Sequence, residues 1–389
     1  MIRYRVPGRR KVSALVFTII FLFYSINVFA IDGVYHSPYG INDLYEIQQT
    51  ERYPRDPVAG ENVYIKITTW PIEFGQATWI SWTKNGVPQP DIGGQWKYNS
   101  GNNSYWEVNM GSFNKGDVIR YTVHANKDGY NEKTIGPFEF TVTDWEYITS
   151  VSGYVDYNNH VILNAIPNTG TFTPKINISF TADDVFRIQM SPTGNNLTAT
   201  GLSNYTVSST SNTITISTSK LKVQVQKNPF RINILKPDGV TVISQQYNSS
   251  INRNMAWLTD GNTVIKKVED HFYTPSTEEF YGFGERYNNF RKRGHDVDTY
   301  VYNQYLNQNE KTYMAIPFFV STRGYGIYLN STYYSKFRMA TEKNDMYSFT
   351  ADTGGSADSI LDYYFIYGDD LKDVISNYTD ITGKPQLPP

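Results

Sequence analysis

Short runs of alternating apolar and polar residues dominate the chain from Glu61 to Val142, a pattern typical of half-buried β-strands. The runs cover residues 63–67, 77–82, 105–108 and 118–123. Asn85 and Gly86 separate two of these runs, and this pair favours a tight hairpin because both residues adopt positive φ readily. Strands spaced in this way over about a hundred residues predict a small sandwich of the immunoglobulin or fibronectin kind, ending near residues 138–142.

A second and longer β region begins near Tyr147. Residues 212–226 predict two strands, because apolar side chains recur at every second position. These apolar positions are Ile214, Ile216, Leu221, Val223 and Val225. The sequence Pro237-Asp238-Gly239 predicts a tight turn between two further strands at 231–234 and 240–243.

A single helix is predicted near the end of the chain. Asp369 or Asp370 is a suitable N-cap, and Gly383 with Pro385 would end the helix. Its predicted apolar face comprises Leu371, Val374, Ile375 and Tyr378. The fold class is therefore all-β, with a signal peptide at 1–30, a small sandwich at 31–146, a larger sandwich at 147–368, and a helix and linker at 369–389.

The first thirty residues resemble an export signal. A basic segment with Arg3, Arg5, Arg9, Arg10 and Lys11 precedes an apolar segment at 12–23 and a small-x-small ending at 28–30. We expect cleavage before Ile31 and a secreted, extracellular protein of the bacterial type, with no membrane contact after cleavage. A retained membrane anchor is the alternative, because residues 12–30 approach spanning length. The absence of cysteine suits an oxidising compartment and excludes thiol catalysis.

Composition narrows the class of partner. With 35 basic and 37 acidic residues the net charge is −2, so the chain has no basic surplus to neutralise a nucleic-acid backbone. Aromatic residues reach 15%, including 32 tyrosines, whereas charged residues make up 19%. Aromatic rings and neutral polar groups suit a surface that stacks on sugar rings and bonds their hydroxyls. We therefore expect a carbohydrate partner and no nucleic acid.

Tryptophans concentrate in the predicted small sandwich. Six of the seven lie in or beside it, at positions 70, 79, 82, 96, 106 and 145. Two interpretations of these tryptophans are open: they form a glycan-binding platform, or they fill the core of a small domain. Trp79 and Trp82 are three residues apart and so point to opposite faces of a strand, which means that only one of them need lie in the core.

Metal, nucleotide and esterase chemistry find no support in the sequence. The five histidines are scattered at positions 36, 124, 160, 271 and 295, without zinc-ligand spacing. Gly282-Phe283-Gly284 lacks the third glycine of a dinucleotide loop, since Tyr287 stands in its place. No serine nucleophile elbow is present. We expect no cofactor, and calcium at a sandwich edge is left open.

Eight short sequence segments, which occur in the same order as in a known family, carry a resemblance to it. They lie at 184–189, 219–223, 238–239, 280–286, 317–321, 324–328, 362–366 and 382–385, and the most distinctive is Phe-Tyr-Gly-Phe-Gly-Glu-Arg at 280–286. Together they resemble the N-terminal, pre-barrel part of glycoside hydrolase family 31. Residues 31–36 and 43–47 look like the leader of the secreted α-isomaltosyltransferases, also called cycloalternan-forming enzymes, of that family.

The resemblance implies that the larger sandwich is galactose-mutarotase-like and that the helix leads into a (β/α)8 barrel beyond Pro389. The family's nucleophile and acid/base aspartates lie on that barrel, so this chain alone is expected to be inactive. A retaining glycosidase needs two carboxyl groups about 5 Å apart, and no such pair is predicted here. The acids considered are Glu278, Glu279, Glu285, Asp296 and Asp298. Glu285 is interpreted as a structural acid that neutralises the basic loop of Arg286, Arg291, Lys292 and Arg293.

The family's N-terminal sandwich also sends one loop over the barrel mouth. The matching segment here is 299–311, and its candidate substrate-binding residues are Asn303, Gln304 and Tyr305. Several family members carry an Asn-Arg-Asp type of sequence at this place, so this chain lacks the acidic residue. Amide and phenol groups still bond hydroxyls. The alternative is an ordinary exposed hairpin tip.

Two functions follow from these observations. The first is the N-terminal portion of a secreted, retaining α-glucan glycosidase or transglycosylase, in which this chain supplies scaffold and a subsite loop. Its partners would be an α-glucan or oligosaccharide and the C-terminal catalytic barrel of the same polypeptide. The second is a free-standing carbohydrate-binding or surface-adhesion protein made of two β-sandwiches.

Overall fold

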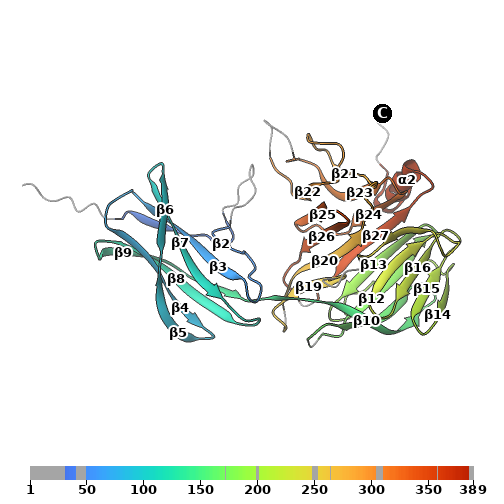
Figure 1. The fold of residues 1–389 in the computed structure, drawn as a ribbon, viewed down its shortest axis with the longest axis horizontal. Coiled ribbons are helices and arrows are strands. Elements are labelled where there is room, and N and C mark those ends of the chain that lie inside the picture. Colours follow the sequence, from blue (N-terminus) through green and yellow to red (C-terminus); the bar gives the residue numbers. More distant parts are fainter. Residues whose placement is uncertain are drawn as a thin grey trace, which may run out of the picture. The chain divides into compact units, whose positions relative to one another are not determined.

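The computed structural model describes residues 31–40, 50–170, 172–198, 201–247, 253–262, 264–303, 310–356 and 358–384 (Figure 1). Within these residues the chain forms twenty-seven strands and one helix, which confirms the all-β prediction. The signal-peptide prediction for residues 1–30 lies outside the described residues. So does the linker from 385 to 389.

Two sheets form the small sandwich. One has the order β1-β3-β7-β6 with β2 beside β3, and the other has the order β5-β4-β8-β9. Their strands are β1 (Gly33–Tyr35), β2 (Arg52–Tyr53), β3 (Asn62–Trp70), β4 (Gln76–Lys84), β5 (Val87–Gly93), β6 (Gln95–Ser100), β7 (Asn103–Ser112), β8 (Val118–Lys127) and β9 (Tyr130–Thr141). On β8 every second side chain is buried, from Ile119 through Tyr121 and Val123 to Ala125. This period of two is the physical basis of the sequence pattern.

The Asn85–Gly86 hairpin is confirmed. Both residues have positive φ, 53° and 80°, and Lys84 pairs with Val87 across the turn. The reading of the tryptophans was partly wrong, because neither Trp79 nor Trp82 belongs to the buried core. Thr78 and Ile80 fill those inward positions on β4 instead. Trp96 on β6 is 54% exposed, so glycan binding by this sandwich stays a prediction.

The larger sandwich combines a thirteen-stranded sheet with a five-stranded one. The large sheet has the order β21-β23-β24-β27-β13-β12-β11-β10-β19-β20-β26-β25-β22. Its strands are β10 (Asp144–Asp156), β11 (Val161–Pro167), β12 (Lys175–Ala182), β13 (Val185–Ser191), β19 (Ala256–Thr259), β20 (Ile265–Tyr273), β21 (Phe280–Gly284), β22 (His295–Asp298), β23 (Ala315–Ser321), β24 (Tyr325–Leu329), β25 (Ser335–Lys343), β26 (Met346–Asp352) and β27 (Leu361–Tyr367). The small sheet runs in chain order through β14 (Thr206–Ser209), β15 (Thr213–Ser217), β16 (Lys222–Gln226), β17 (Arg231–Leu235) and β18 (Val242–Gln245).

One hydrophobic core joins the two sheets of this sandwich. The predicted positions Ile214, Ile216, Leu221, Val223 and Val225 are all buried in it. Aromatic rings fill the part under β20, β26 and β27, where Phe272 stacks on Tyr347 at 5.1 Å and meets Tyr363 edge-on at 6.2 Å. Rings of this size bury large apolar areas and so contribute strongly to the stability of the sandwich.

The helix α2 (Leu371–Thr382) begins and ends as predicted. Asp370 accepts hydrogen bonds from the backbone amides of Lys372 and Asp373, and Gly383 follows the last turn with φ 94°. Val374 is buried against the sheet face formed by β23, β24 and β27, and the ring of Tyr378 stacks on Phe318 at 3.9 Å. Ile375 is 49% exposed, so its predicted place on the buried face was wrong. At 100° per residue it lies at the edge of the stripe that the sheet covers.

The described residues divide into two compact units. One contains residues within 1–38, 64–110 and 119–139, and the other contains residues within 39–63, 111–118 and 140–389. The predicted domain boundaries stay predictions. Among the described residues, no helix has both the length and the apolar character needed to cross a membrane.

Asp270 is a fully buried acid in the centre of the larger sandwich. Its carboxylate accepts hydrogen bonds from Gln246 Nε2, Tyr363 Oη and the backbone amides of Met255 and His271, at 2.9–3.1 Å. Burial raises the pKa of Asp270 to about 6, because removal from water penalises the charged form more than these donors favour it.

This raised pKa predicts a pH-dependent stability. An acid whose pKa is higher in the folded state stabilises the fold when protonated, so its contribution is complete below about pH 4 and is lost as the pH rises through about 6. Relative to Asp270→Asn, the wild-type free energy of unfolding should fall by about 2 kcal/mol between about pH 4 and about pH 7. Urea unfolding across this pH range measures the difference, with the exposed Asp369→Asn as control. A rising difference would mean that the hydrogen bonds outweigh the burial.

Candidate functional site

The predicted substrate loop lies between β22 and β23 of the large sheet. Among its candidate residues, Asn303 is exposed at the start of the loop. Gln304 and Tyr305 lie outside the described residues. The structure therefore describes both ends of the loop, from Thr299 to Asn303 and from Glu310 onward, and these ends determine where the loop leaves the sheet.

Arg286 ties the two ends of this loop together. Its guanidinium donates to the backbone oxygens of Asp298 and Glu310, each at 2.5 Å, and to that of Phe283 at 3.1 Å. Asp298 is the last residue of β22, and Glu310 stands just before the chain enters β23. The planar guanidinium presents several donors in a rigid fork, so one side chain holds three carbonyl groups that lie far apart in sequence.

The local sequence Gly-Phe-Gly-Glu-Arg, at residues 282–286, explains how the Arg286 side chain comes to lie between the two ends of the loop. Phe283 is buried and has a φ of 71°, and Gly284 follows with a φ of 83°. A β-carbon on Gly284 would collide with the backbone oxygen of Met314, which lies on the neighbouring chain segment. Glycine is therefore required for the close approach of β21 to the segment that leads into β23. The turn at these residues directs the Arg286 side chain toward the loop ends.

We call the two paired segments at the base of the loop, residues 298–302 and 310–312, its neck. Further contacts join these segments. Val301 forms a parallel bridge with Thr312, and the Tyr302 amide donates to Thr312 O at 2.9 Å. The Thr312 hydroxyl donates to the backbone oxygen of Glu285. Tyr302 is buried, and its ring lies 4.9 Å from that of Tyr300. These contacts fix the backbone directly before Asn303.

Burial shifts the pKa values of two side chains at the neck, Arg286 and Tyr302. Burial lowers the pKa of the Arg286 guanidinium from its ordinary value, and the nearby Asp298 acts in the opposite direction. Burial also raises the pKa of the Tyr302 phenol, with Asp298 as the next contributor. Arginine stays protonated despite such shifts. A positive charge surrounded by carbonyl oxygens therefore lies at the base of the loop.

The acids considered from the sequence each have a place in the structure. Glu278 is buried and accepts from Ser321 Oγ at 2.5 Å and Tyr325 Oη at 2.7 Å.

Asp296 forms an ion pair with Lys336 at 2.9 Å. Glu285 accepts from Tyr287 Oη at 2.6 Å. Glu279 immediately precedes β21, and Asp298 lies at the neck. The role expected of Glu285, neutralising the basic loop, differs from what is seen, since Tyr287 is its hydrogen-bond partner.

Arg286 is the residue that sequence reasoning missed. The sequence predicts that it belongs to one basic loop with Arg291, Lys292 and Arg293, whereas its hydrogen-bond partners are backbone carbonyls. The position directly after Gly-Phe-Gly-Glu was the available signal. A glycine-dependent close approach of two chain segments leaves carbonyl groups in need of donors.

Replacement of Arg286 should loosen the neck. In Arg286→Lys the fork is lost, and a single ammonium cannot serve three carbonyl groups. We expect the Tyr302 amide to exchange with solvent at least about tenfold faster, which corresponds to about 1.4 kcal/mol. Hydrogen exchange read by NMR or mass spectrometry measures this, with the exposed Arg291→Lys as matched control. Equal rates in both variants would show that the bridge between Val301 and Thr312 suffices by itself.

Two segments of the chain match models of known protein families. Residues 35–106 match the model described as Lmo2446-like, N-terminal. Residues 175–337 match the glycosyl hydrolase 31 N-terminal galactose mutarotase-like domain, a span that includes β21, β22 and the neck of the loop.

Among curated proteins, the isomaltosyltransferase of Sporosarcina globispora is 67% identical over 376 residues, covering 97% of this chain and 34% of that protein. The alpha-glucosidase 2 of Bacillus thermoamyloliquefaciens is 29% identical over 228 residues, covering 55% of this chain and 27% of its own length. This chain thus spans about a third of the length of these relatives or less.

Among solved structures, the cycloalternan-forming enzyme from Listeria monocytogenes in complex with a pentasaccharide substrate superposes with a TM-score of 0.84 at 48% identity. The match covers 92% of this chain and 34% of that one. Another Listeria monocytogenes structure, of lmo2446, contains glucose, magnesium and calcium. In the part of this chain that the structure describes, no three His, Cys, Asp or Glu side chains gather as metal ligands, so no residues are assigned to such an ion. Residues 175–337 thus form the N-terminal galactose-mutarotase-like domain of glycoside hydrolase family 31.

Proposed function

We propose that this chain is the N-terminal portion of a secreted, retaining α-glucan enzyme that transfers or hydrolyses glucosyl or isomaltosyl units. The observation that carries the proposal is the 67% identity to an isomaltosyltransferase over 97% of the chain. Identity at this level extends through both sandwiches and is not confined to a motif. The substrate would be an α-glucan or oligosaccharide, and the partner of this chain would be a catalytic barrel in the same polypeptide.

In this proposal the chemistry follows double displacement. A carboxylate attacks the anomeric carbon while a second carboxyl group protonates the departing oxygen, and a sugar hydroxyl or water then displaces the enzyme. Both acids would lie beyond Pro389. The role of this chain is to position one wall of the substrate site, through the loop that Arg286 anchors.

The loop has the chemistry to meet sugar. Asn303 and Gln304 offer amide groups that both donate and accept, and Tyr305 offers a hydroxyl on an aromatic ring. Arg286 and the bridge between Val301 and Thr312 fix the base of the loop. An ordered base reduces the entropy lost when the loop contacts a ligand.

Export is the remaining part of the proposal. The basic and apolar segments of residues 1–30 support it, and so does the position of Ile31, the expected first residue of the mature chain. Ile31 is buried, and the amide of Asp32 donates to Trp70 O at 2.8 Å. Ile31 and Asp32 are therefore built into the small sandwich, which supports a mature chain that includes them.

The decisive experiment compares two proteins. The first is expressed with the coding sequence that the proposal places after codon 389 and recovered from the culture medium, where its N-terminus should be Ile31. It should turn over an α-glucan, and NMR should show the α-anomer as the first product, as retention requires. The second is the 389-residue chain alone, which should show no turnover. Activity in the short chain, or a β-anomer as first product of the long one, would refute the proposal.

Variants of the loop test its contact with substrate. In the full-length protein, each of Asn303→Ala, Gln304→Ala and Tyr305→Ala should lower kcat/KM by about tenfold, the effect of one lost hydrogen bond of about 1.4 kcal/mol. Steady-state kinetics on an α-glucan oligosaccharide measures this. The exposed Asn262→Ala, in a turn outside the loop, is the control. If all four variants match wild type, the loop is an ordinary surface hairpin.

A further inference from the structure

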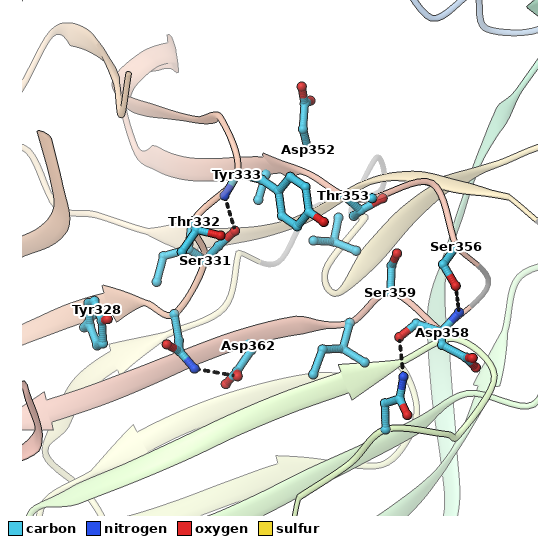
Figure 2. A pocket seen from close by; sticks show the side chains of 17 residues that line it. Tyr328, Ser331, Thr332, Tyr333, Asp352, Thr353, Ser356, Asp358, Ser359 and Asp362 are labelled. Carbon is cyan, nitrogen blue, oxygen red and sulfur yellow. Dashed lines mark hydrogen bonds between the residues drawn. The ribbon is translucent and has the colours of Figure 1, made fainter. Parts of the chain in front are cut away.

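A polar pocket of about 480 Å³ opens at one end of the large sheet, apart from the predicted substrate loop. Its walls are the connection from β24 to β25 and the connection from β26 to β27, and Asn196 contributes from the segment after β13 (Figure 2). The volume falls within the usual range of small-molecule sites. All of these residues belong to the same compact unit.

Neutral hydroxyl groups dominate the lining. They belong to Ser331, Thr332, Thr353, Ser356 and Ser359. Two amide side chains, Asn196 and Asn330, add further donors and acceptors. Hydroxyl and amide groups both donate and accept hydrogen bonds, so the pocket matches a ligand that also carries several hydroxyl groups.

Two of the acids in the lining already have cationic partners. Asp352 pairs with Arg55 and Lys267, each at 2.7 Å. Asp362 receives a bidentate bond from Arg187, at 2.8 and 2.5 Å. A metal ion would have to compete with these cations for the carboxylate oxygens. The pocket therefore favours a neutral ligand over a cation.

Asp362 also orients the floor of the pocket. Its carboxylate accepts from Asn330 Nδ2 at 2.8 Å, in addition to Arg187. On the far wall, the backbone oxygen of Asp358 accepts from Asn196 Nδ2 at 3.2 Å, and the Asp358 amide donates to Ser356 Oγ at 3.1 Å. Figure 2 draws the bonds that Asn330, Asn196 and Ser356 make, and together with the Arg187 pair they fix the polar groups before any ligand arrives. Such preorganisation lowers the cost of binding.

Tyr333 supplies an aromatic surface at the pocket. Its side chain extends toward Thr353 in Figure 2, and the residue is 50% exposed. A β-carbon on Gly354 would lie 2.7 Å from the Tyr333 hydroxyl, so the glycine leaves room for the ring to reach across the opening. An aromatic ring beside an array of hydroxyl groups suits the apolar face and polar rim of a pyranose.

We propose that this pocket is a non-catalytic binding site for a neutral sugar unit of an oligosaccharide, with Tyr333 stacking on the ring and the surrounding hydroxyl and amide groups bonding its hydroxyls. The class of ligand follows from the pocket, whereas the choice of an α-glucan as probe rests on the proposed function. No bond is made or broken at this site. It would hold a chain of substrate or product at a distance from the predicted loop.

Site-resolved hydrogen exchange tests the inference in the full-length protein. With millimolar isomaltotriose and short labelling pulses, peptides covering 328–334 and 353–362 should become protected. In Tyr333→Ala the concentration needed for half of this protection should rise at least about tenfold. Ser359→Phe, which fills the pocket and keeps Tyr333, should abolish the protection. The control is Tyr157→Ala, because Tyr157 is a similarly exposed tyrosine, at 54%, outside the pocket.

Several outcomes would overturn the inference. These are no protection of the two peptides in the wild type, equal protection in Tyr333→Ala, equal protection by glycerol, or protection by millimolar calcium chloride in place of the sugar. Turnover of α-glucan by the same preparation is measured in parallel. Turnover without protection refutes the pocket and leaves the proposed function standing, whereas protection without turnover does the reverse.

Discussion

Burial of β27 on both faces is the constraint on which the larger sandwich depends. This strand lies between β24 and β13 in the large sheet, and six of its seven residues are buried. Leu361, Tyr363 and Phe365 point into the main core. Ile366 points to the opposite face, where it packs in the cluster that α2 covers. A shift of one residue would turn Asp362 toward the main core and Tyr363 away from it, so the register of β27 with its neighbours is strongly specified.

Asp362 is the polar exception on this strand, and its position explains why a pocket can form at that end. Its two oxygens accept from Arg187 on the neighbouring β13 and from Asn330 beyond β24. A buried charge is costly unless it is paired and its remaining lone pairs are bonded, and these contacts meet both conditions. The same sheet face is therefore apolar under α2 and polar at the pocket. One strand supports a core, a helix and a binding surface.

Local signals in the sequence predicted much of this fold. The Asn85–Gly86 turn, the strands around Ile214 and Val223, and the cap at Asp370 all depend on neighbouring residues alone, so a single sequence reveals them. Ile375 shows the limit, since helical period identifies a stripe but not how much of it the sheet covers. At Arg286 the preceding Gly-Phe-Gly-Glu segment was a usable signal of a close approach, but its carbonyl partners at Asp298 and Glu310 leave no trace in the sequence. The pocket was missed for a similar reason. Ser331 and Ser359 look like ordinary loop residues until β24, β26 and β27 bring their loops together.

The two polar features differ in how the fold stabilises them, and this difference bears on their roles. The neck of the loop depends on one cation that holds three main-chain oxygens, so its order is concentrated in Arg286. The pocket is held by ion pairs to Asp352 and Asp362 that are distributed over several strands. A loop that completes a reactive site must place a few atoms closely, because small displacements there lower the rate steeply. A site that only retains a polymer needs a stable surface with many weak contacts, and distributed ion pairs beneath a hydroxyl-rich lining provide that.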